Sequence, residues 1–194
     1  MEFGLSRAQL LELLANAMFI APDRRSALLG RFQHLQRLAI VGGVNPGRGK
    51  AAKYSSQQVL VIAFAFQLLQ VGMTPERAVQ IVKENLSSFD TAIDLLLAGE
   101  GAYATFDPCV LSASNNGSNT DVALQSFVIM TRETLPDAID IYFGGHDVEF
   151  PRIVIISLTS IFELICQFLD HGSGMPSSLA FKVALEERGN LGDS

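Results

Sequence analysis

Three cations, Arg48, Lys50 and Lys53, stand within a short stretch of the segment NPGRGKAAKYSSQQ, residues 45–58, which we call the basic segment. Glycine and alanine separate the cations, and Tyr54 and a pair of serines follow them. Lys and Arg side chains can bind the phosphates of a polyanion, and glycine lets the backbone come close to it. The alternative is that these cations only solubilise a surface hairpin.

The charge of the chain is divided unevenly between its two halves. Residues 1–86 contain ten Lys and Arg against five Asp and Glu, whereas residues 87–194 contain four against fifteen. The halves therefore carry +5 and −11, which together give the net charge of −6. A basic half can meet a polyanion, and an acidic half tends to stay off it. We therefore expect two units with different partners, with a boundary near Gly99–Gly101.

The elements around the basic segment are predicted to be helices. Ser6 and Ser55 are each followed three residues later by Gln, the spacing of a capping box that opens a helix. Pro22 and the pair Thr74-Pro75 suit helix starts as well. With the apolar periodicity, these signals predict helices over residues 7–17, 23–40, 57–71, 75–85 and 89–98. The glycines and proline between the second and third helices predict a hairpin whose tip lies near residues 45–50.

The second half has a different pattern. Short runs that favour β-strands are separated by Pro, Asn and Gly: AYATF, CVLSAS, ALQSFVIMT, AIDIYF and RIVIIS. SNNGSNTD, residues 114–121, is typical of an exposed loop. The run LTSIFELICQFLDHG predicts a helix that ends at Gly172.

The order helix, turn, helix, basic hairpin, helix, helix resembles the winged helix-turn-helix of the MerR family over about residues 6–85. KYSSQQVLVIAFAFQLLQVGMTPERAVQIV, residues 53–82, carries the closest likeness. Tyr54-Ser55 falls where the family's wing joins the next helix, and residues 72–76 fall at the turn between the last two helices. The family's Arg-Tyr-Tyr/Trp-Glu motif is replaced here by residues 30–34, and its long C-terminal coiled-coil helix is missing.

The resemblance implies an α+β chain in three parts. Residues 1–86 would form an all-helical winged helix-turn-helix DNA-binding domain, residues 87–100 a connecting helix or linker, and residues 101–194 a smaller α+β dimerisation or regulatory domain with short strands and one long helix. The expected function is that of a bacterial, sequence-specific transcriptional regulator that binds double-stranded DNA as a homodimer. Its DNA contacts would come from Arg24, Arg25, Arg31, Arg37, Arg48, Lys50, Lys53 and Tyr54. The alternative is a protein-interaction adaptor, or a phage or mobile-element accessory factor, that reuses the fold.

Patterns typical of an enzyme are missing from the sequence. Cys109 and Cys166 lack metal-ligand spacing, His146 lies in a turn-like GGHD, and NPGRGK lacks the spacing of a phosphate-binding loop. The apolar stretch 153–169 is interrupted by Glu163 and is shorter than the roughly 20 residues of a membrane-spanning helix. We therefore expect a cytoplasmic protein that is not an enzyme, holds no cofactor or metal, and responds to an unknown effector, if any, through its C-terminal domain.

Overall fold

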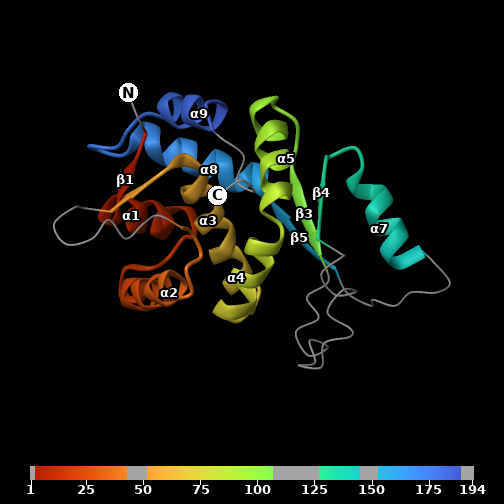
Figure 1. Ribbon diagram of the computed structural model, residues 1–194, viewed down its shortest axis with the longest axis horizontal. Coiled ribbons are helices and arrows are strands. Elements are labelled where there is room, and N and C mark those ends of the chain that lie inside the picture. The colour runs from red at the N-terminus through yellow and green to blue at the C-terminus, as the bar shows by residue number, and fades with distance from the viewer. Residues whose placement is uncertain (1–2, 43–51, 107–126, 145–152, 189–194) are drawn as a thin grey trace.

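A computed structural model describes residues 3–42, 52–106, 127–144 and 153–188 (Figure 1). Within these ranges the chain forms an α+β fold of helices and two small antiparallel sheets. The first half contains β1 (Leu5–Ser6), α1 (Arg7–Ala17), η1 (Pro22–Arg24), α2 (Arg25–Arg37), β2 (Lys53–Tyr54), α3 (Ser56–Gln70), α4 (Pro75–Glu84) and α5 (Leu86–Leu97). The second half contains β3 (Tyr103–Phe106), β4 (Val128–Met130), α7 (Leu135–Gly144), β5 (Val154–Ser157), α8 (Leu158–His171) and α9 (Ser178–Glu186).

Both capping boxes predicted from the sequence are formed. The Ser6 hydroxyl accepts the backbone N–H of Gln9, and the Gln9 side-chain oxygen accepts the N–H of Ser6 at 2.9 Å. Ser55 and Gln58 repeat this arrangement at the start of α3. The termini of α1 and α3 therefore agree with the sequence to within one residue. The expectation of a helix over 23–40 was too long, because Ala39 adopts a left-handed φ of +52° that a helix cannot continue through.

Three expectations about secondary structure were wrong. The first half is not all-helical, because β1 pairs with β2 in antiparallel register, Leu5 opposite Tyr54. AIDIYF is not a strand but lies within α7, where Pro136 and Asp137 in the first turn favour a helix. A short apolar run without alternation does not distinguish the two structures. The second half also has three helices rather than one long helix, since α7 and α9 accompany α8. CVLSAS and residues 114–121 lie outside the described residues.

The hydrophobic core is continuous across the two halves of the chain. The buried apolar residues form a single cluster in which α8 packs against α1 and α3, and α9 packs against α3 and α5 (Figure 1). Phe64 of α3 and Phe89 of α5 lie 5.0 Å apart between ring centroids, and Phe127, just before β4, lies 6.0 Å from Phe64 and 6.1 Å from Phe106 of β3. A break at residues 99–101 would therefore expose the faces of α1 and α3 that α8 and α9 cover. Whether the two halves serve different partners stays a prediction.

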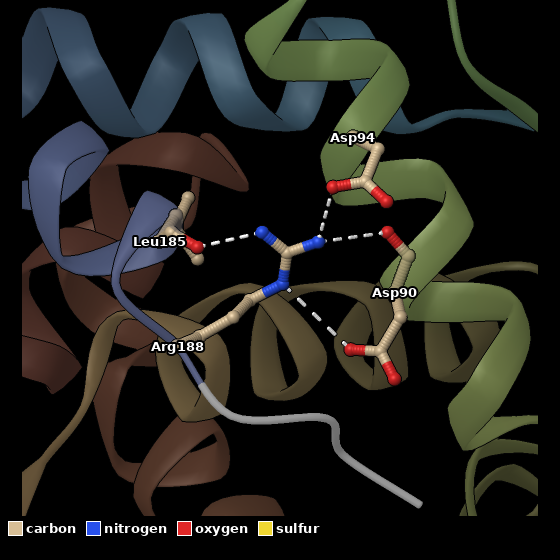
Figure 2. A network of polar contacts seen from close by, with 4 residues as sticks. All are labelled: Asp90, Asp94, Leu185 and Arg188. Carbon is tan, nitrogen blue, oxygen red and sulfur yellow. Dashed lines mark hydrogen bonds and ion pairs between the residues drawn. The ribbon is translucent and has the colours of Figure 1, made fainter.

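Arg188 fastens the end of α9 to α5 (Figure 2). Its guanidinium donates to the carbonyl oxygen of Leu185 at 2.6 Å, to that of Asp90 at 3.1 Å, and to the Asp94 carboxylate at 2.6 Å. Its Nε also lies 3.7 Å from the Asp90 carboxylate. The Arg188 side chain is 10% exposed, so these charge-assisted contacts are largely shielded from water. Among the described helices, none is long and apolar enough to span a membrane.

Candidate functional site

The side of α2 that faces away from the core is polar and open. The helix buries Leu28, Phe32 and Leu35. At 3.6 residues per turn, the opposite side carries four exposed residues that we call the outer face of α2: Ser26, Gly30, Gln33 and Arg37. A Cβ added at Gly30 would meet nothing within 4 Å. The outer face therefore offers polar side chains on either side of a gap through which another molecule can approach the helix backbone.

The structure separates the arginines that the sequence grouped together. Arg24, Arg25, Arg31 and Arg37 are all exposed, but only Arg37 belongs to the outer face of α2. Arg24 lies in η1 and pairs with Asp23 at 3.5 Å, with both side chains about three-quarters exposed. Arg25 and Arg31 lie on the flanks of α2. Arg48 and Lys50 lie outside the described residues.

The ends of the chain that flank the undescribed part of the basic segment are both held at the start of α3. Gln58 donates its side-chain amide to the carbonyl oxygen of Gly42 at 2.9 Å. On the other side, Lys53 is exposed on β2 opposite Ser6. Lys53 lines a small cleft of about 140 Å³ with Phe3, Ser55 and Gln58. A lysine beside a helix N-terminus puts two sources of positive potential in one place.

Tyr54 holds β2 against α2, and the prediction that it contacts DNA was wrong. Its side chain is fully buried, so its ring cannot touch a duplex. Gln36 donates to the Tyr54 hydroxyl oxygen at 2.6 Å, and the Tyr54 ring meets Phe32 edge to face at 5.9 Å between centroids. Burial raises the pKa of Tyr54, and the nearby charge of Arg7 opposes that shift. Side chains alternate along a strand, so Lys53 faces outward while Tyr54 faces inward.

Arg7 is an exposed cation that the sequence analysis did not select. Its guanidinium carbon lies 5.8 Å from the centroid of the Phe32 ring, a cation–π arrangement. Arg7 follows Ser6, the pairing partner of Lys53, so both cations lie beside the same short sheet. Arg7 is also the first residue of α1, where the positive end of the helix dipole disfavours a cation. That conflict was the signal available in the sequence.

The remaining polar side chains near α2 have structural partners. His34 lies 3.1 Å from the Glu76 carboxylate and links α2 to α4, and Lys83 donates to the carbonyl oxygen of Leu38 at 3.1 Å. Cys166 is half-buried, and burial raises the pKa of its thiol, which disfavours the reactive thiolate. No group of three or more His, Cys, Asp and Glu in the described part of the chain could hold a metal ion. His146 and Cys109 lie outside it.

Comparison with known proteins adds no relative. No protein-family model, no curated protein and no solved structure matches the chain. Any function must therefore be argued from the geometry of the chain itself.

Proposed function

We propose that this protein is a sequence-specific DNA-binding regulator, and that it holds double-stranded DNA with the outer face of α2 and the basic segment. The observation that carries the proposal is the tie between these two parts. The β1–β2 pair and the Gln36–Tyr54 hydrogen bond fix the end of the basic segment against α2. A helix that follows a turn, flanked by a basic segment anchored to it, is the arrangement of a winged helix-turn-helix.

The two parts would contribute different kinds of contact. Gln33 can pair with the N6 and N7 edge of adenine, and Arg37 with the O6 and N7 edge of guanine. Gly30 lies between them, where a missing side chain allows a close approach to the groove. Arg7 and Lys53 lie beside the short sheet and would bind phosphates, which supply affinity without sequence preference.

The test is a selection of bound duplexes from a random library, followed by fluorescence anisotropy at several salt concentrations. Gln33→Ala should cost on the order of 1–3 kcal/mol on the selected duplex and nearly nothing on a random one. Lys53→Ala should weaken binding to both duplexes and lower the salt slope by about 0.9. Arg132→Ala removes an exposed cation from the second half and is the matched control. Failure to enrich any sequence, or an equal loss in the Arg132 variant, would contradict the proposal.

We place the homodimer contact in residues 101–194, on the sheet of the second half. Val128 and Ile155 flank Thr105 in the same row of the sheet, and each is 39% exposed. Two exposed apolar side chains on one sheet face favour burial against a second copy. Light scattering on the full chain should give a dimer that Val128→Ser with Ile155→Ser dissociates. A monomer in the unchanged chain would refute this placement without touching DNA binding.

A second candidate function, a protein adaptor, is favoured by Phe19. This side chain is 82% exposed and sits at a left-handed φ of +53°, a conformation that disfavours bulky residues. An exposed aromatic at a strained position is a frequent mark of a contact surface. If Phe19→Ser leaves DNA binding intact while the chain enriches a sequence, regulation is favoured. If no sequence is enriched and Phe19→Ser abolishes a partner complex, the adaptor is favoured.

A further inference from the structure

A cleft between α1 and α2 lies apart from the outer face of α2. It has a volume of about 340 Å³ and is lined by Ala8, Leu11, Glu12, Ala15, Arg25, Leu28 and Leu29. Sites for small molecules have volumes of roughly 300–1,000 Å³ and are mostly apolar, with a few polar groups that orient the ligand. The cleft matches that description in both size and composition.

The floor of the cleft is apolar because the two helices do not close completely over it. Ala8, Leu11 and Ala15 recur along one side of α1, and Leu28 and Leu29 come from α2. The small side chains on α1 leave room that a larger residue would fill. Leu29 is still 37% exposed, so an apolar group seated in the cleft would remove further apolar surface from water.

Two opposite charges lie on the lining of this apolar cleft. Glu12 comes from α1 and Arg25 from α2. Among the described residues, neither takes part in an ion pair or a side-chain hydrogen bond. A ligand with only a carboxylate would be attracted by Arg25 and repelled by Glu12, and one with only an ammonium would meet the reverse. Charge complementarity therefore favours a ligand that carries both groups around an apolar body.

We propose that the cleft between α1 and α2 binds a zwitterionic apolar molecule of the size of a dipeptide. Arg25 holds its carboxylate through a guanidinium fork, Glu12 holds its ammonium, and Leu11, Leu28 and Leu29 cover its apolar side chains. Such a ligand has two sources, a free apolar amino acid or a short peptide. The proposal does not depend on DNA binding, because Gln33 and Arg37 of the outer face do not line the cleft.

The test is isothermal titration of the full chain without DNA, using leucyl-leucine, leucine, N-acetyl-leucyl-leucine and leucyl-leucine amide as the probes. Leucyl-leucine should bind, and each blocked dipeptide should bind at least tenfold more weakly. Tighter binding of leucine than of leucyl-leucine would assign the site to a free amino acid, and the reverse to a peptide. Equal binding of all three dipeptides would overturn the proposal, as would no binding by any of the four probes.

Variants of the chain assign each charge to its partner. Arg25→Gln should weaken leucyl-leucine at least tenfold but leave the amide unchanged, since the amide has no carboxylate to lose. Glu12→Gln should weaken leucyl-leucine but leave the acetylated dipeptide unchanged. Ala8→Phe, at an exposed position on the lining, should block all probes. Arg132→Gln and Glu100→Gln, which remove exposed charges elsewhere, are the matched controls. Losses of equal size in the control and cleft variants would overturn the proposal.

Discussion

Replacing Arg188 with Ala should lower the free energy of unfolding by about 3 kcal/mol. Two backbone carbonyls, those of Leu185 and Asp90, lose a charged donor, and the Asp90 carboxylate, whose side chain is 17% exposed, loses its ion-pair partner (Figure 2). Asp94 contributes little because its side chain is 74% exposed and water already screens it. The cost is therefore dominated by the groups left without a partner in the interface between α9 and α5.

The measurement is urea unfolding of the full chain, followed by far-UV circular dichroism. Asp94→Asn should cost at most about 0.5–1 kcal/mol, because it tests only the exposed part of the network. Arg188→Lys should recover less than half of the loss, because one ammonium cannot reach three acceptors in different directions. Arg31→Ala, at an exposed cation on α2, is the control. If Arg188→Ala and Arg31→Ala lower the stability by the same amount, the reasoning about the shielded network fails.

Three further changes test individual features of the fold. Phe19→Gly should raise the stability by about 0.5–1 kcal/mol in urea unfolding, since glycine tolerates the left-handed conformation that already occurs at Gly72; a loss would mean that the exposed ring has a packing role. Tyr54→Phe should cost about 1 kcal/mol, because the Gln36 amide loses its acceptor, and an unchanged midpoint would refute that bond. Hydrogen bonds from the Ser178 N–H and hydroxyl lower the pKa of Asp170. A carboxyl with a lowered pKa stabilises the fold at neutral pH and loses that effect as the pH falls below about 4, so Asp170→Asn should flatten the stability profile between about pH 6 and 3; identical profiles would refute it.

The sequence by itself determined the elements whose signals are local. The Ser–Gln capping boxes fixed the starts of α1 and α3, and Thr74 with Pro75 fixed the start of α4, because a cap involves residues only three positions apart. An almost wholly apolar sequence also predicted that α3 would lie in the core. The exposed arginines of α2 were predicted for the same reason, since charged side chains seldom enter a core.

Tertiary structure alone decided the features that depend on residues far apart in the chain. Two-residue strands carry no periodicity, so the pairing of Leu5 with Tyr54, which turns Tyr54 inward and leaves Lys53 outside, could not be predicted. The end of α2 depended on the conformation of Ala39, a residue that gives no local stop signal. The packing of α8 onto α1 joins the two halves that the charge pattern had divided. Charge is a property of each segment, whereas burial depends on which distant apolar faces meet, and only the folded chain specifies that meeting.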